Sequence, residues 1–231
     1  MERIPRAMLR RMSGALTTEE RNEMAIPSYL HPNPLMRWMA WRRVEVLARH
    51  MEQVFAQRSA SDHAPIVMDF GCGTGVLFRE TNRHASRIYG VDLILDAAQL
   101  LVDEWRLDGV TLLTPVEAER KIPQKGVDLI LAAEVLEHLS SLDETLRFFA
   151  SRLRPDGRLL ISVPTENLVY RLGRKLAGFR GEYHVSHASA IHQAVLRAGF
   201  RTECLEKVPA AGPLAMYWVV GYSYPDAMRP Q

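Results

Sequence analysis

The chain has 231 residues, of which 47% are apolar, and a formal net charge of +2 at pH 7. This length and composition allow a sizeable core and fit one large α/β domain better than two small ones. The small net charge argues against nucleic-acid binding, and no apolar run reaches the ~18 residues typical of a membrane span. Cys72 and Cys204 have neither pairing nor metal-ligand spacing, so we expect a cytoplasmic protein with no disulfide framework and no metal site.

Residues 1–34 are predicted to be an N-terminal extension that is partly disordered. The first eleven residues, MERIPRAMLRR, are rich in arginine, but Glu2 and Pro5 argue against a transit peptide or a membrane-surface segment. We therefore expect a frayed, solvated tail. Residues 17–20 have the Ser/Thr-x-x-Glu form of a helix start, and the prolines that follow are expected to end that helix: Pro27, Pro32 and Pro34.

A long amphipathic helix is predicted at the start of the domain, which we place at residues 35–231. The apolar residues recur at steps of three and four from Leu35 to Phe55: Trp38, Trp41, Val44, Leu47, Met51 and Val54. We expect these tryptophans and methionines in the core and Arg42, Arg43 and Arg49 at polar positions. The leading helix occupies residues 35–60.

Strands and helices then alternate along the chain. The predicted strands are 66–70, 87–91, 110–113, 127–132 and 158–163, and the helices lie at about 75–85, 94–106 and 141–153. A second capping box begins at Ser141, and Pro155-Asp156-Gly157 supplies a turn. A helix at 188–198 and a hairpin from runs 201–208 and 214–222 close the chain. Such alternation predicts a doubly wound α/β fold with a mostly parallel sheet.

A glycine-dense turn, DFGCGTG, follows the first strand at residues 69–75. Ligands of open parallel sheets bind at the carboxyl ends of the strands, and glycine lets them approach the backbone. A nicotinamide-binding motif would need the third glycine one position later, and a phosphate-binding loop would need a lysine that is absent nearby. Asp92 ends the second strand, where a carboxylate can accept both hydroxyl protons of a ribose. The turn and Asp92 together therefore favour a nucleoside ligand.

Four blocks follow one another within residues 60–225: VMDFGCGTG, YGVDL, VDLILAAEVLEHL and LRPDGRLLISVP. In this order they resemble the class I S-adenosylmethionine-dependent methyltransferases, in the bacterial type 11/23 group that includes ubiquinone-biosynthesis O-methyltransferases. The resemblance implies a Rossmann-like sheet of seven strands, with the last strand antiparallel. It also implies S-adenosyl-L-methionine as the cofactor and O-methylation of a small-molecule or lipid-like metabolite.

The resemblance also implies which residues bind the cofactor. The turn would hold the methionine end, Asp69 would fix the turn and the amino group, and Asp92 would bind the ribose. Leu93 would pack against adenine, and Glu117 would accept from the adenine amino group, with a solvated loop glutamate as the alternative. The implied cofactor residues are Asp69, Gly71, Cys72, Gly73, Thr74, Gly75, Asp92, Leu93, Glu117, Ala118 and Glu134.

Two histidines are the candidate catalytic residues. His138 lies four residues after Glu134, so a helix would place both on one face, where His138 is expected to shape the site. His184 is the candidate general base, because histidine titrates near neutral pH; an ordinary loop histidine is the alternative. His187 is expected at the start of the next helix.

Residues 165–187 are predicted to form a lid on the acceptor side. Within residues 168–180, five apolar side chains share one face and basic residues lie between them. One interpretation is a helix packed on the domain with solvated arginines. The other is contact with a lipid-like acceptor or with a membrane surface.

Two other functions remain open at this point. A nicotinamide-dependent oxidoreductase is opposed by the position of the third glycine. A non-catalytic protein that binds S-adenosylmethionine would keep the whole cofactor site and lack acceptor chemistry.

Overall fold

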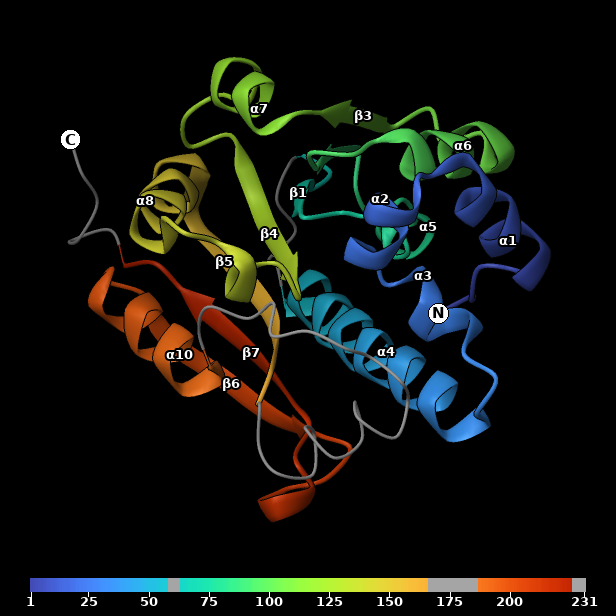
Figure 1. The fold of residues 1–231 in the computed structure, drawn as a ribbon. Coiled ribbons are helices and arrows are strands. Elements are labelled where there is room, and N and C mark those ends of the chain that lie inside the picture. Colours follow the sequence, from blue (N-terminus) through green and yellow to red (C-terminus); the bar gives the residue numbers. More distant parts are fainter. Residues whose placement is uncertain (58–62, 166–186, 226–231) are drawn as a thin grey trace. The chain divides into compact units, whose positions relative to one another are not determined.

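The computed structural model describes residues 1–57, 63–165 and 187–225 (Figure 1). Seven strands form one sheet in the order β3-β2-β1-β4-β5-β7-β6, which confirms the predicted α/β class. The last strand, β7 (Tyr217–Ser223), is antiparallel to both of its neighbours, as predicted. The chain divides into two compact units, Met1–Ile122 and Pro123–Gln231, and we describe each in turn.

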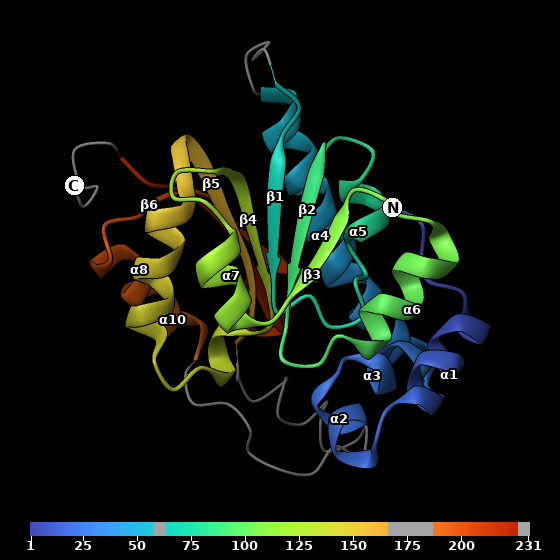
Figure 2. The ribbon, with the colours of Figure 1, turned by 90° about the horizontal axis from the view of Figure 1, so that it is seen from above.

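The first unit contains three parallel strands, β1 (Ile66–Phe70), β2 (Arg87–Val91) and β3 (Val110–Leu113). All three have the predicted bounds. Helices α4 (Pro34–Gln57), α5 (Phe78–Thr81) and α6 (Asp96–Trp105) lie on one side of these strands, and α7 (Pro115–Lys121) lies on the other (Figures 1 and 2). The carboxyl ends of β1 and β2 lie next to each other, because Phe70 pairs with Val91.

The frayed tail predicted for the first residues is wrong. Helix α1 (Arg6–Ala15) is followed by α2 (Thr18–Glu23) and α3 (Ile26–Leu30). Helix α1 contacts α6 and buries Met8, Leu9 and Met12. Arginines lie between these apolar residues, so the composition of the segment favoured a solvated tail over a helix with a buried face. The predicted helix start at Thr17 is confirmed by a capping box with Glu20, whereas the division into an extension and a domain at residue 34 stays a prediction.

Helix α4 is confirmed, with two corrections to its side chains. Trp38 is 43% exposed, because it belongs to the first turns of the helix, where Leu35 is also exposed. Arg43 is only 7% exposed, since it shares a helix face with the buried Leu47 and Met51. The polar position assigned to Arg43 was therefore wrong.

Two further helices of the first unit differ from expectation. Helix α5 is shorter than the predicted 75–85, because Gly75 keeps a φ of 72° that a helix does not allow. Helix α7 was not predicted. It begins after Thr114 and has Pro115 in its first turn, a favoured position for proline.

The second unit contains β4 (Val127–Ala133), the short helix η1 (Leu136–His138), α8 (Leu142–Arg152), β5 (Leu153–Pro164), α10 (Ala188–Arg197), β6 (Arg201–Val208), η2 (Gly212–Leu214) and β7. Strands β4 and β5 are parallel, and β6 and β7 form the predicted hairpin. Helices α8 and α10 contact each other (Figure 2). Within the described residues, no helix is long and apolar enough to cross a membrane.

Two local predictions in the second unit were wrong. Ser141 precedes α8 but makes no side-chain cap hydrogen bond. The turn at Pro155–Gly157 lies inside β5, which begins at Leu153 and shifts register against β4 before Arg158. Asp156 there has a φ of 62°, so the turn became an irregularity of the strand rather than its boundary.

Candidate functional site

The glycine turn after β1 keeps three residues in the left-handed backbone region. The φ angles are 74° at Gly71, 51° at Gly73 and 72° at Gly75, which glycine adopts at little cost. The main-chain nitrogens of Gly71 and Cys72 donate to the carbonyl oxygen of Val91, at 2.8 and 3.1 Å. A Cβ added at Gly73 would meet no atom within 4 Å. The turn is thus fixed to the end of β2 and leaves open space beside Gly73.

Asp92 joins the two strand ends. Its Oδ2 accepts a hydrogen bond from the main-chain nitrogen of Gly73 at 2.7 Å. Its Oδ1 accepts from the main-chain nitrogens of Leu93 at 2.7 Å and Ile94 at 3.4 Å. A carboxylate has about four acceptor sites, so capacity remains for a ligand hydroxyl. The side chain of Leu93 is 81% exposed. Asp92 is therefore already oriented by the turn, and the predicted ribose and adenine positions lie beside one another in the chain.

Asp69 and Cys72 are buried at the base of the turn. Burial, and to a smaller extent the neighbouring charge of Asp92, raises the pKa of Asp69 to about 7. Burial also raises the pKa of the Cys72 thiol, with a further contribution from the two carboxylates. Thr74 is buried as well. These side chains support the turn from within, and a direct bond from Asp69 to the cofactor amino group stays a prediction.

Glu117 caps helix α7. Its Oε2 accepts from the Thr114 main-chain nitrogen at 3.0 Å, and Lys121 Nζ donates to Oε1 at 2.8 Å. The hydrogen bond from Lys121, followed by those from Thr114, lowers the pKa of Glu117 to about 2. Glu117 is therefore neither a solvated loop residue nor a free hydrogen-bond acceptor. Its contact with adenine stays a prediction. Ala118 is fully buried behind it.

Glu134 follows β4 in the second unit and has a φ of 55°. Its main-chain nitrogen donates to Ser162 O at 2.8 Å, and the Ser162 hydroxyl donates to Glu134 Oε1 at 3.4 Å. His138 is exposed in η1, which begins after Glu134, so the helical face predicted for the two residues is wrong. The left-handed backbone at Glu134 interrupts any helix between them. His187 precedes α10 as expected, and His184 lies outside the described residues.

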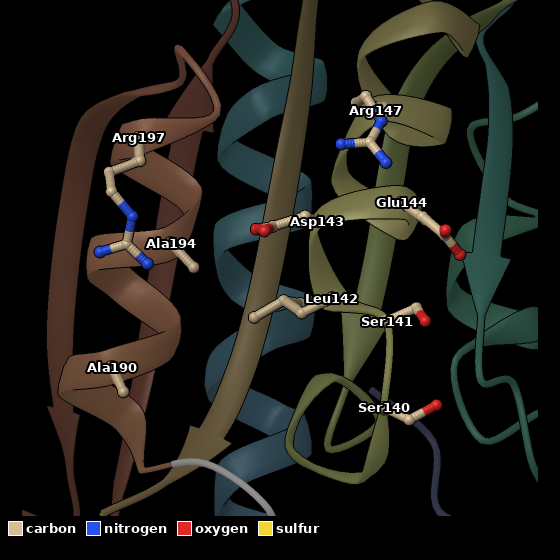
Figure 3. Close-up of a pocket in the computed structure, with 9 residues that line it drawn as sticks. All are labelled: Ser140, Ser141, Leu142, Asp143, Glu144, Arg147, Ala190, Ala194 and Arg197. Carbon is tan, nitrogen blue, oxygen red and sulfur yellow. The ribbon is translucent and has the colours of Figure 1, made fainter.

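A hollow of about 490 Å³ lies on the second unit, between the start of α8 and α10 (Figure 3). Its lining carries both signs of charge, with Asp143, Glu144 and Arg147 on α8 and Arg197 on α10. None of the predicted site residues lines this hollow. It is an open, polar surface feature, and the candidate site remains at the strand ends. The described residues also contain no group of three His, Cys, Asp or Glu side chains that could hold a metal ion.

The comparison with protein families decides the class of the protein. A family model for a methyltransferase domain matches residues 37–205, which is more than half of the chain. The chain is a class I S-adenosylmethionine-dependent methyltransferase. S-adenosylmethionine is its cofactor, and the family match argues against the nicotinamide alternative.

Curated relatives share part of this methyltransferase. The ubiquinone biosynthesis O-methyltransferase of Bradyrhizobium diazoefficiens is 33% identical over 104 residues, which are 44% of this chain and 40% of that protein. The tRNA U34 carboxymethyltransferase of Idiomarina loihiensis is 28% identical over 173 residues, 70% of this chain and 50% of that protein. The matches to these two proteins thus span only 40% and 50% of their own lengths.

Solved structures share the fold at low identity. The N-methyltransferase NodS of Bradyrhizobium japonicum, in complex with S-adenosyl-L-homocysteine, has a TM-score of 0.64 and 15% identity, covering 95% of this chain and 99% of NodS. Magnesium protoporphyrin IX methyltransferase of Synechocystis, also with S-adenosyl-L-homocysteine bound, has a TM-score of 0.62 and 17% identity, covering 94% of this chain and 93% of that protein. These likenesses concern the fold alone.

Proposed function

We propose that this methyltransferase transfers the methyl group to an oxygen atom of a small-molecule or lipid-like acceptor. Binding of the cofactor is supported by the hydrogen bond from the Gly73 main-chain nitrogen to the Asp92 carboxylate. This bond holds the glycine turn and the carboxylate together in the arrangement that one nucleoside would need. The preference for oxygen is supported by the name of the ubiquinone biosynthesis relative, at 33% identity. Other similar proteins act on tRNA or are N-methyltransferases, so the acceptor atom needs a direct test.

The residues of the first unit fit the cofactor. Open space at Gly73 lets the amino-acid end approach main-chain nitrogens, and the unused acceptor capacity of Asp92 suits a ribose hydroxyl. Leu93 would supply an apolar surface for the adenine ring. When bound, the cofactor supplies an activated methyl group, so the protein has mainly to align the acceptor within near-attack distance.

The acceptor side is proposed from the sequence. His184 would take the proton of the acceptor hydroxyl, since an imidazole has a suitable pKa near neutral pH. Glu134 would lie at the cofactor, and His138 would shape the site rather than move a proton. The His184→Ala variant should then lower the methylation rate strongly at neutral pH and much less at high pH, where the acceptor ionises by itself. An equal loss at every pH would contradict the role of a base.

Residues 165–187 would cover the acceptor, and residues 168–180 would provide a peripheral contact with a membrane. This proposal comes from the spacing of apolar and basic residues in a segment outside the described residues. Deletion of 168–180 should reduce both turnover of the acceptor and cosedimentation with anionic vesicles. Unchanged values for both would end this proposal.

The central experiment measures methyl transfer from labelled S-adenosylmethionine into fractions of a cell extract. A labelled product that disappears with Asp92→Ala identifies the acceptor and its chemical class. Calorimetric titration with S-adenosylhomocysteine and with NADH checks the cofactor independently. A protein that binds the first ligand but labels no fraction would favour the non-catalytic alternative; the similarity in fold to the [4+2]-cyclase SpnF, at a TM-score of 0.58, shows that fold alone does not decide the reaction.

A further inference from the structure

The ring of Phe78 lies between the glycine turn and strand β2. Phe78 is the first residue of α5 and is fully buried, and its main-chain nitrogen donates to Gly75 O at 2.9 Å. A Cβ added at Gly75 would lie 2.5 Å from ring atom Cδ2, and one added at Gly90 would lie 2.6 Å from Cζ. Since real Cβ atoms do not approach so closely, both glycines mark places where the ring touches the backbone.

Gly90 is unusual because it lies inside a strand. Glycine weakens a strand interior and often marks a close approach of another group. Gly90 pairs in register with Asp69 of β1 and precedes Asp92 by two residues. The ring of Phe78 therefore presses on β2 directly beside the two acidic residues of the site and, at its other edge, on the turn.

We propose that Phe78 is a positioning residue for the cofactor, whose ring, seated between Gly75 and Gly90, sets the distance between the glycine turn and Asp92. The 2.7 Å bond from the Gly73 nitrogen to Asp92 Oδ2 is the result of that spacing. The inference rests on the proposed roles of the turn and of Asp92. A cofactor that spans both would lose affinity when the ring is displaced, because one of its ends would no longer fit.

The first test is Gly90→Ala, with Gly221→Ala as the matched control. The new methyl group at position 90 would displace the buried ring toward the turn, and we expect the Kd for S-adenosylhomocysteine to rise about tenfold. Gly221 lies in β7 of the other unit, and a Cβ there would be 2.8 Å from Cys204 Sγ. This similarly crowded strand glycine should change the Kd by less than about twofold, whatever it does to the melting temperature.

The second test removes the ring from the crowded variant. Gly90→Ala/Phe78→Leu should recover part of the lost affinity and bind as well as Phe78→Leu alone, since leucine leaves room for the added methyl group. Leu112 offers the control, because its Cδ2 would lie 2.8 Å from the same Cβ. Gly90→Ala/Leu112→Ala should recover little. Recovery through Leu112 alone, or a Gly90→Ala affinity equal to that of Gly221→Ala, would overturn the proposal.

A third measurement does not depend on Gly90→Ala and tests the proposal even if that variant does not fold. Phe78→Leu removes the ring but keeps an apolar side chain at this buried position. It should weaken S-adenosylhomocysteine several-fold more than adenosine, because only the larger ligand reaches both the turn and Asp92. Equal losses for the two ligands would show a merely structural role. A wild-type protein that binds neither ligand would instead refute the cofactor site itself.

Discussion

Asp69 is buried at the end of β1 with a pKa raised to about 7 from its usual 3.8. The folded protein therefore keeps this proton while the unfolded chain loses it, so stability falls as pH rises from about 4 to about 7 and then levels off. Asp69→Asn has no such proton to lose. We expect its melting temperature, relative to wild type, to increase across that pH range. A difference that does not change with pH, or an equal trend for the exposed Asp103→Asn, would contradict this explanation.

Asp92 is the residue on which the cofactor site depends most directly. Asp92→Asn removes the charge and alters the acceptor for Gly73, and hydrogen bonds to charged groups contribute about 1.5–3 kcal/mol each. We expect the affinity for S-adenosylhomocysteine to fall by at least about tenfold, with a much smaller effect on stability. Calorimetric titration measures this loss. The exposed Asp103→Asn serves as the control and should bind as wild type does.

The sequence predicted the turn and Asp92 because both depend on local chemistry: glycine at positive φ and an acid at a strand end. Glu117 shows the limit of this reasoning. Residues Thr114 to Glu117 have the Ser/Thr-x-x-Glu form, with Pro115 as the first helical residue, and this pattern is typical of a helix start such as that of α7. Phe78 could be found only from three-dimensional contacts, although a glycine inside the predicted strand at Gly90 indicated a close neighbour.

Helix α1 gives a test at the level of one element. Met12 is fully buried in it, and replacing a buried methionine by alanine typically costs about 2–5 kcal/mol. Met12→Ala should therefore lower the free energy of unfolding by that order in a urea titration. The exposed Arg10→Ala on the same helix should have almost no effect. If both variants unfold like wild type, the first helix contributes nothing to the stability of its unit.

The strands were easier to predict than the helices. Each strand of the first unit is a short apolar run next to a turn signal, such as Pro65 before β1 and Gly109 before β3, and the bounds followed directly. The helices depended on tertiary packing. Arg43 is buried although its residue type favours the surface, and α1 forms where the composition favours a solvated tail.

For the whole molecule, binding of the cofactor product should appear as added thermal stability. A ligand at one hundred times its Kd stabilises the folded state by about 2.7 kcal/mol. S-adenosylhomocysteine should raise the melting temperature in proportion to the logarithm of its concentration, and NADH should not. Asp92→Asn should need about ten times more ligand for the same rise. A thermal shift with NADH alone would contradict the cofactor assignment.

Strand β6 ends the order of strands, and among the described strands it pairs only with β7. The outer edge of such a strand has unpaired main-chain N–H and C=O groups, to which a strand of another chain can hydrogen-bond. Charged side chains recur along β6 at Arg201, Glu203 and Lys207, and an incoming chain would have to strip water from them. The charges on β6 thus oppose the edge-to-edge pairing through which sheets of separate molecules could join.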